Sequence, residues 1–120
     1  METDKFLRSI IEQDTAKVVV CDLDNKVVYI NKRAREAYGD KILNKSIFDC
    51  HNKNSQELIC KVVDWFKKSK ENNIVHTFYN EKHNKDVYMV ALRDENGELI
   101  GYYEKHEYRN RDFTPFYDLK

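Results

Sequence analysis

A strand-turn-strand-helix unit near the start of the chain constrains the fold more than any other feature of the sequence. Residues 17–23 and 27–30 are rich in valine, and the Asp24-Asn25 pair between them is typical of a tight turn. Asn31 can then cap a helix over residues 32–38, and Gly39 can end that helix. The unit therefore predicts a hairpin that leads directly into a short helix.

A longer amphipathic helix is predicted in the middle of the chain. It begins at Asn54 or Ser55 and ends near Ser69, after a short linking turn that Ser46 can cap. Its positively charged end suits the negative end of the helix macrodipole. The apolar stripe is Leu58, Ile59, Val62, Val63 and Phe66, and the basic end is Lys67, Lys68 and Lys70.

Three further strands are predicted after this helix. The first covers residues 74–79, and the other two form a long hairpin over residues 86–106 whose turn is Asn96-Gly97. Two strands, then helices, then three strands predict one α+β domain. We divide the chain into an N-terminal helix (residues 1–14), a core domain (15–108) and an aromatic tail (109–120).

Composition limits the function. The 120 residues carry 21 basic and 21 acidic side chains, so the basic excess of a general nucleic-acid binder is missing. No apolar run reaches membrane-spanning length, and no signal-peptide core follows the polar start. The odd count of three cysteines favours reduced thiols. A cytoplasmic protein that binds neither nucleic acid nor membrane is expected.

The first third of the chain resembles the PAS domain family. The resemblance lies in Asp22, Asn25, Asn31, Ala34 and Gly39, which follow an apolar strand in the order of the PAS signature. It extends over about residues 5–108. It implies a five-stranded antiparallel sheet with the first strand beside the last at its centre and with helices packed on one face. It also implies a ligand or cofactor pocket between the two layers, and frequent dimerisation through an N-terminal amphipathic helix.

A narrower resemblance covers residues 49–55. This segment is similar to the Cys-His-Pro-Pro-Lys-Ser segment of bacterial PAS domains found beside hemerythrin-like domains. Cys50, His51 and Ser55 match by type, whereas Asn52 and Asn54 replace the two prolines. The resemblance makes His51 and Ser55 the first candidates for contact with a ligand.

The candidate ligand-binding residues are therefore His51, Ser55, Tyr88 and Tyr102. His51 has two interpretations: a pocket group, as an axial ligand of haem or a hydrogen-bonding group to another small molecule, or a histidine whose ring fixes the loop by binding backbone. Tyr88 and Tyr102 are weaker candidates because strand parity alone does not say which face is inward. We expect His76 to face solvent or pair across the sheet, and His106 to be exposed or at an interface.

Enzyme chemistry is not expected. Cys50 and His51 are neighbours in sequence, and adjacent side chains rarely face one another as a nucleophile and its base must. We interpret Cys21, Cys50 and Cys60 as small buried hydrophobes. The cysteine motif of covalent flavin photochemistry is missing from the sequence, and no metal site is predicted. The identity of the ligand is left open, with haem and other small molecules as alternatives.

An apolar stripe on the N-terminal helix predicts self-association. The stripe consists of Phe6, Leu7, Ile10 and Ile11, which recur at helical spacing, and such a surface must be buried on its own domain or on a partner. We expect a homodimer, with Phe113, Phe116 and Tyr117 of the tail as further contacts. The sequence thus predicts a PAS sensory domain that binds a small molecule and signals by homodimerisation or by docking on an unidentified signalling protein. The alternative is an adaptor module without a ligand.

Overall fold

The computed structural model describes residues 3–119. Its elements follow the predicted order, with strand and helix ends that differ from the predicted ones by only a few residues. They are α1 (Thr3–Gln13), β1 (Lys17–Asp22), β2 (Val27–Ile30), α2 (Lys32–Tyr38), the 3-10 turns η1 (Asp40–Ile42) and η2 (Ile47–Cys50), α3 (Lys53–Lys68), β3 (Ile74–Asn80), β4 (Lys85–Arg93) and β5 (Leu99–Tyr108). The predicted N-terminal helix (residues 1–14) includes Met1 and Glu2, and the predicted tail includes Lys120; these three residues lie outside the described part of the chain.

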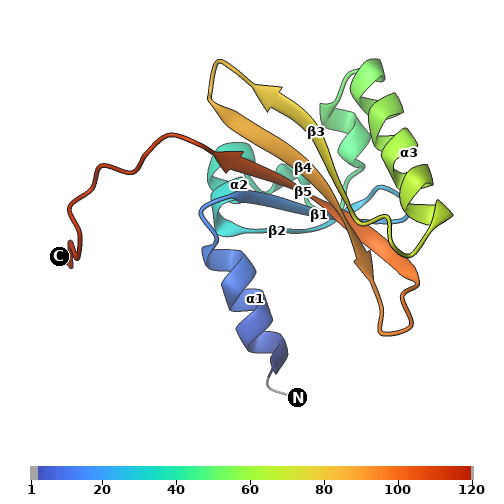
Figure 1. Cartoon of the computed structure of the whole chain (residues 1–120), viewed down its shortest axis with the longest axis horizontal. Helices are drawn as coiled ribbons and strands as arrows, with labels where there is room; N and C mark the ends of the chain where they lie inside the picture. The colour runs from blue at the N-terminus through green and yellow to red at the C-terminus, as the bar shows by residue number, and fades with distance from the viewer. Residues whose placement is uncertain (1–2, 120) are drawn as a thin grey trace.

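The five strands form one antiparallel sheet in the order β2-β1-β5-β4-β3. β1 pairs with β5 from Lys17 opposite His106 to Asp22 opposite Gly101, which brings the two ends of the core domain together (Figure 1). The predicted placement of the first strand beside the last is confirmed. Asn25 and Gly97 both have positive φ, at 64° and 81°, as tight hairpin turns require.

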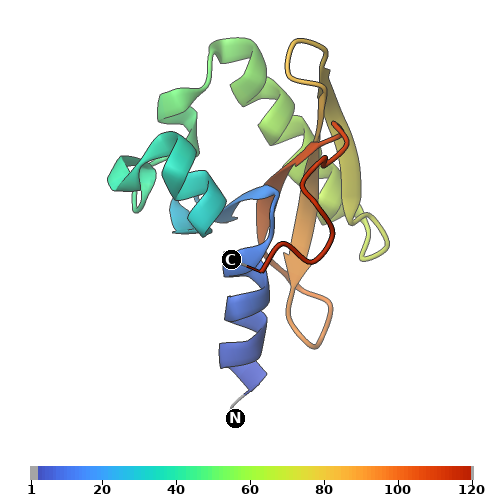
Figure 2. The same cartoon turned by 90° about the vertical axis from the view of Figure 1, so that its left-hand side faces the viewer.

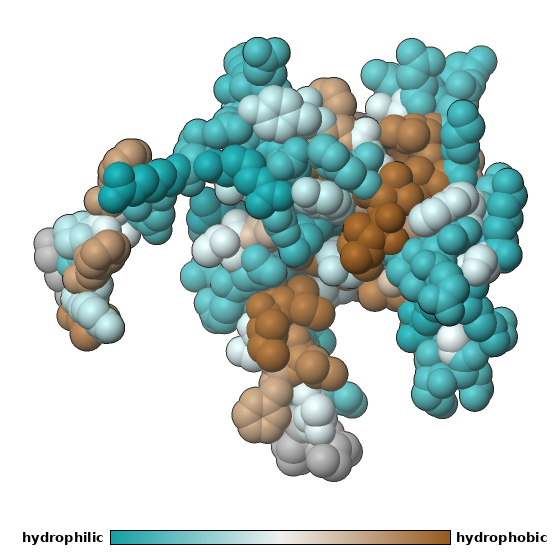
Figure 3. Space-filling view, in the orientation of Figure 1, coloured by the Kyte–Doolittle hydropathy of each residue, from teal (hydrophilic) through white to brown (hydrophobic). Residues whose placement is uncertain are grey.

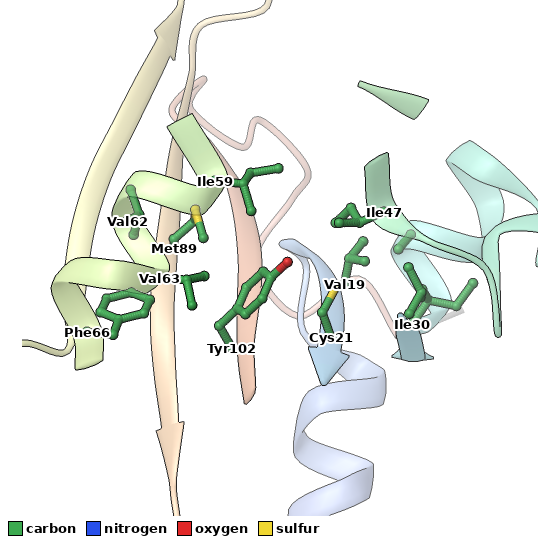
Figure 4. Close-up of a cluster of buried hydrophobic side chains, with 12 residues drawn as sticks. Val19, Cys21, Ile30, Ile47, Ile59, Val62, Val63, Phe66, Met89 and Tyr102 are labelled. Carbon is green, nitrogen blue, oxygen red and sulfur yellow. The ribbon is translucent and has the colours of Figure 1, made fainter. Parts of the chain in front are cut away.

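The helices α2 and α3 cover one face of the sheet, and a hydrophobic core fills the space between the layers (Figure 2). Figure 4 shows Tyr102 of β5 standing between side chains of α3 and those of β1. Tyr102 and Phe66 are fully buried, and they are the two largest side chains of the core. The other core members are Val19, Cys21, Val27, Ile30, Ala34, Ile47, Ile59, Val62, Val63 and Met89.

Side-chain caps start the helices on this face. The Asn31 side chain accepts from the Ala34 amide at the start of α2, and the amide of Gly39 closes its end. Ser46 caps η2, as predicted. The α3 cap is Asn52, so the helix begins slightly earlier than predicted.

The carboxyl end of α3 is held by an arginine from β4, in addition to the lysines within the helix. One guanidinium nitrogen of Arg93 donates to the carbonyls of Phe66, Ser69 and Asn72 at 2.8, 3.0 and 3.0 Å. The Arg93 Nε also donates to Asn73 Oδ1 at 2.7 Å. Positive charge therefore meets the end of α3 as expected, and the direct hydrogen bonds come from a residue distant in sequence.

The N-terminal helix α1 projects away from the sheet, and none of its residues is buried (Figure 1). Phe6 and Ile10 expose 68% and 66% of their surfaces, while Ile11 exposes 37%. Figure 3 shows these apolar residues gathered along the helix. Its last turn is tied to the domain, because Glu12 pairs with Arg35 of α2 and the Ile11 carbonyl accepts from Asn31. One turn earlier, the Arg8 guanidinium lies over the ring of Tyr29 in β2, 5.2 Å from its centroid. The stripe is therefore largely exposed within a single chain, and its burial on a partner stays a prediction.

The tail and the cysteines complete the fold. Residues 109–119 contain no helix or strand, and Phe113, Phe116, Tyr117 and Leu119 are 78–92% exposed.

Cys21, Cys50 and Cys60 are all free thiols. Cys21 is buried as predicted, but the prediction is wrong for Cys50 and Cys60, which are exposed because they lie on the outward sides of η2 and α3. Within residues 3–119, no helix is both long enough and apolar enough to cross a membrane.

Candidate functional site

A cavity of about 260 Å³ lies between the start of α3 and the inward faces of β3, β4 and β5. Half of its lining is apolar, and the other half consists of groups that can form hydrogen bonds. The apolar side chains are Leu58, Ile59, Phe78, Val87 and Met89, and the polar ones are His51, Ser55, Thr77, Glu104 and His106.

His51 and Ser55, the two leading sequence candidates, both line this cavity. His51 ends η2, where its Nδ1 lies 2.8 Å from the Ile47 carbonyl oxygen. Ser55 lies in the first turn of α3, and its amide donates to the Asn52 side chain at 2.9 Å. One ring nitrogen of His51 thus binds backbone and fixes the loop, as one interpretation expects. The other nitrogen is turned toward Glu104 across the cavity, where it could meet a ligand.

Sequence reasoning missed Glu104 and His106 of β5. His106 Nε2 lies 2.9 Å from Glu104 Oε1, and His51 Nε2 lies 3.8 Å from Glu104 Oε2. Each of the two β5 side chains is only 12% exposed, so the prediction of an exposed or interfacial His106 is wrong. The reason is strand parity, because Glu104 and His106 alternate with the buried Tyr102 and share its inward face.

The two tyrosine candidates lie elsewhere. Tyr102 is fully buried in the core, where its hydroxyl donates to Asn25 Oδ1 at 2.7 Å. Tyr88 lies on the outer face of the sheet, because its neighbours Val87 and Met89 point inward. The Tyr88 ring stacks on His76 at 4.9 Å, and its hydroxyl accepts from Arg109. Neither tyrosine lines the cavity.

His76 pairs across the outer face of the sheet, the interpretation favoured from sequence. Its Nε2 lies 2.8 Å from Asp86 Oδ1. A bulge between His76 and Phe78 changes the alternation of β3, so that Phe78 lies opposite the inward-facing Val87. Phe78 therefore borders the cavity while His76 does not, although simple alternation would place both on one face.

Two thiols near the cavity have raised pKa values, mainly because of burial. Partial burial of the Cys50 sulfur raises the pKa of this thiol, although the residue as a whole is exposed, and the Glu104 carboxylate adds to this effect. Burial likewise raises the pKa of Cys21 to about 12, again with a contribution from Glu104. Cys50 Sγ does lie 3.6 Å from His51 Nδ1, but that nitrogen is already bonded to a carbonyl oxygen. A thiol with a raised pKa and no free base beside it is a poor nucleophile.

The residues of the cavity do not form a metal centre. Among residues 3–119, no group of three or more His, Cys, Asp or Glu side chains is placed to hold a metal ion. The cavity instead combines an apolar wall with several hydrogen-bonding side chains, a combination typical of small-molecule sites.

A second hollow, of about 700 Å³, lies under α1 on the opposite face of the sheet. Its wall is mostly apolar, and it combines residues of α1 with outward-facing residues of β1, β2 and β5. The main apolar members are Ile10, Ile11, Val18, Val20, Val28 and Tyr103. We call this hollow the α1 groove.

Comparison with known proteins agrees with this architecture. The family model of the PAS domain matches residues 15–104. A PAS domain of a protein from Colwellia psychrerythraea superposes with a TM-score of 0.66 at 14% identity, covering 89% of this chain and 97% of that one. A C-terminal domain from Streptococcus mutans gives a TM-score of 0.68 at 17% identity, with 88% and 84% coverage.

A third solved structure, a sensory box sensor histidine kinase from Vibrio cholerae, gives a TM-score of 0.59 at 11% identity, with 91% of each chain covered. None of the curated proteins compared with the chain matches it. At these identities the structures establish the fold alone, whereas the family model extends over most of the sequence. The strand order, the helical layer and this match together show that the chain belongs to the PAS domain family.

Proposed function

We propose that this PAS domain is a cytoplasmic sensory module that binds a small molecule in the cavity at His51 and Ser55. Its signal passes by homodimerisation or by docking on a signalling protein. The observation that carries the ligand-binding part is that His51, Ser55 and Glu104, from three different elements, line one cavity together with an apolar wall. Three free cysteines support a reducing compartment.

The size of the cavity limits the ligand. A volume of about 260 Å³ lies just below the range of roughly 300–1,000 Å³ for sites that hold drug-sized molecules. A haem belongs to this class of larger ligands. The cavity as it stands is therefore too small for one, although His51 could offer an axial nitrogen. No cysteine is among the lining residues, so a flavin would find no thiol there for covalent attachment. The proposed ligand is therefore a small organic molecule.

Three measurements test ligand binding. Native mass spectrometry of freshly purified protein should detect a retained small molecule, and the visible absorption spectrum should be free of haem and flavin bands. Calorimetric titration with the identified molecule should then show weaker binding to His51→Ala, by roughly 5- to 150-fold for the loss of a buried hydrogen bond. His83→Ala is the matched control, because His83 is exposed in the β3–β4 turn. Equal affinities for His51→Ala and wild type, with the fold intact by circular dichroism, would remove His51 from the site.

One observation favours the alternative of a ligand-free adaptor. The centre of the domain is filled by the side chains of Tyr102, Phe66 and Met89, all of which are almost fully buried. An adaptor of this kind would retain no small molecule in native mass spectrometry and would still bind its protein partner. The mass measurement therefore separates the two functions.

Homodimerisation is supported by the surface of α1. Phe6, Leu7 and Ile10 are all more than half exposed, and the α1 groove beside them is apolar. A second copy of the chain can cover both surfaces at once, because it brings the same helix and the same groove. The exposed aromatic tail, with Phe113, Phe116 and Tyr117, adds apolar surface that such a dimer could also bury.

Sedimentation analysis tests this part of the proposal. Wild-type protein should be dimeric at micromolar concentration, and Ile10→Glu should be monomeric because it places a charge in the apolar contact. Ser9→Glu adds the same charge to the same helix away from the stripe, and it should remain dimeric. A monomeric wild type, or an unchanged dimer in Ile10→Glu, would refute the α1 interface.

Strand β5 gives a route by which ligand and dimer could affect each other. Its alternate residues Glu104 and His106 line the cavity, whereas Tyr103 and Lys105 line the α1 groove. If the two equilibria are coupled, linkage requires ligand to change dimer affinity by the same factor as dimerisation changes ligand affinity. Sedimentation with and without the retained ligand measures this factor, and a factor of one would restrict signalling to docking on a partner.

A further inference from the structure

Hydrogen bonds already present in the structure decide what the cavity can offer a ligand. His51 Nδ1 lies 2.8 Å from the Ile47 carbonyl oxygen, which can only accept. The proton of a neutral His51 must therefore be on Nδ1. Its Nε2, on the side of Glu104, then carries a lone pair and acts as an acceptor.

Thr77 and Glu104 are acceptors for similar reasons. The Thr77 hydroxyl donates to the Val87 carbonyl at 3.2 Å, so only its oxygen lone pairs remain. A carboxylate has no proton to donate. Glu104 Oε1 accepts from His106, while Oε2 lies 3.8 Å from His51 Nε2, beyond hydrogen-bond distance. Among the polar lining groups, only the rotatable hydroxyl of Ser55 has a proton left to donate when both histidines are neutral.

Apart from the two histidines, the charged side chain in the cavity lining is the carboxylate of Glu104. Glu104 is 12% exposed, and no lysine or arginine is among the residues that line the cavity. A buried carboxylate without a cationic partner is unfavourable. Among the lining residues only His51 and His106 face this carboxylate as possible cations, and when both rings are neutral a cationic ligand would supply the missing positive charge.

The positive end of the macrodipole at the start of α3 would favour an anionic ligand, but this effect is reduced here. Asn52 caps this helix, with its side chain accepting from the Ser55 amide at 2.9 Å and its carbonyl accepting from the Gln56 amide at 2.9 Å. The amides that would attract an anion are thus already engaged in part. The Glu104 carboxylate is the stronger influence on the ligand.

We propose that the ligand of this cavity is a small organic cation with N–H donors, such as a primary alkylammonium. The inference rests on the proposed function and adds the chemical class of the ligand. Two acceptors 3.8 Å apart, Glu104 Oε2 and His51 Nε2, can both lie about 2.7–3.2 Å from one ammonium nitrogen. The alkyl part of the ligand would lie against the apolar wall of Leu58, Ile59 and Met89.

The test compares three probes of similar size and different charge: butylamine, butanol and butyrate. Amide resonances of the 15N-labelled full chain are followed at pH 8, where histidines are mostly neutral. Butylamine should shift the amides of Ser55, Thr77 and Glu104 and should bind at least tenfold more tightly than butanol, as expected for a charge-assisted hydrogen bond. Butyrate should leave these amides unchanged.

Variants locate the preference. Glu104→Gln should reduce butylamine affinity by about tenfold or more, and Thr77→Val should reduce it by a smaller factor while keeping the side-chain shape. Glu107→Gln is the matched control, because Glu107 is on the same strand but faces outward and pairs with Lys105. Undiminished butylamine binding in Glu104→Gln would overturn the inference.

The outcomes for the ligand class and for the site itself are separate. If butanol or butyrate shifts the cavity amides as strongly as butylamine does, the cationic class is wrong but a binding site is present. If none of the three shifts them at millimolar concentrations, the inference fails. The proposed function then depends on whether native mass spectrometry finds another retained molecule.

Discussion

Replacing Asn31 by alanine should destabilise the domain more than the loss of an ordinary helix cap. Asn31 is fully buried, and its side chain connects three elements. Its Oδ1 accepts from the amides of Val18 in β1 and Ala34 in α2, each at 3.0 Å. Its Nδ2 donates to the carbonyls of Ile11 at 3.0 Å and Ala16 at 2.8 Å. One side chain therefore caps α2 and ties the end of α1 to the sheet.

The magnitude follows from these bonds. Loss of a helix cap costs about 1 kcal/mol. The buried amide of Val18 would also lose its side-chain acceptor, which costs about 1–3 kcal/mol. With the carbonyls of Ile11 and Ala16 also losing a donor, the free energy of unfolding should fall by about 3–5 kcal/mol. That is a large part of the roughly 5–15 kcal/mol typical of a domain.

Urea unfolding followed by circular dichroism measures this difference. Asn52→Ala is the control, because Asn52 caps α3 in the same way at an exposed position and should cost only about 1 kcal/mol. Asn31→Asp keeps the capping oxygen but turns a second oxygen toward the carbonyls of Ile11 and Ala16, so it should also be destabilising. If Asn31→Ala costs no more than Asn52→Ala, the reasoning about a buried three-way connection is wrong.

Three other changes test separate parts of the fold. Gly101→Ala would place a Cβ 2.3 Å from a carbonyl oxygen of β1 and should cost at least about 1–3 kcal/mol, so a melting temperature equal to that of wild type would contradict it. The ion pair with Arg35 lowers the pKa of Glu12 from 4.5 to about 2, so its contribution is complete above pH 4.5 and disappears as the pH falls through 2. The stability difference between wild type and Glu12→Gln in urea should therefore shrink from pH 4.5 to pH 2, and a constant difference would refute the pairing. Arg93→Lys should cost about 1–3 kcal/mol in the same assay, because an ammonium does not reproduce the forked guanidinium contacts at the end of α3, while Lys67→Ala should change stability by less than about 0.5 kcal/mol; equal effects would contradict this assignment.

The fold could be predicted because its elements have strong local signals. Asn31 and Gly39 bound α2, and the Asn96-Gly97 turn fixes the last hairpin. The start of α3 was less certain, because Asn52, Asn54 and Ser55 can all cap a helix and only tertiary contacts select the first. The role of Arg93 at the end of α3 was also hidden, since it lies 21–27 residues beyond the carbonyls that it binds.

Only part of the candidate site could be predicted from the sequence, for a related reason. His51 and Ser55 stand close together in the chain at a helix start, so a local segment brings both to the cavity. Phe78 and Thr77 reach the cavity because of a bulge in β3, and no turn residue or glycine in the sequence predicts that bulge. Tyr88 was a reasonable candidate by residue type, and its outward direction depends on the register between β3, β4 and β5.

The remaining residues of the candidate site depend on which residues of β5 face inward, and residue polarity alone does not determine this. The inward set contains Tyr102, Glu104 and His106, and the outward set contains Tyr103, Lys105 and Glu107, so each alternate set has one tyrosine followed by two polar residues. A rule that places charged residues outside would hide Glu104, yet its carboxylate points into the domain beside two histidines. Such a conflict between a residue and its location is expected where function, and not stability, has selected the side chain. If the proposed ligand site exists, Glu104 is the position at which a change should affect ligand choice most while leaving the outer face of the sheet unaltered.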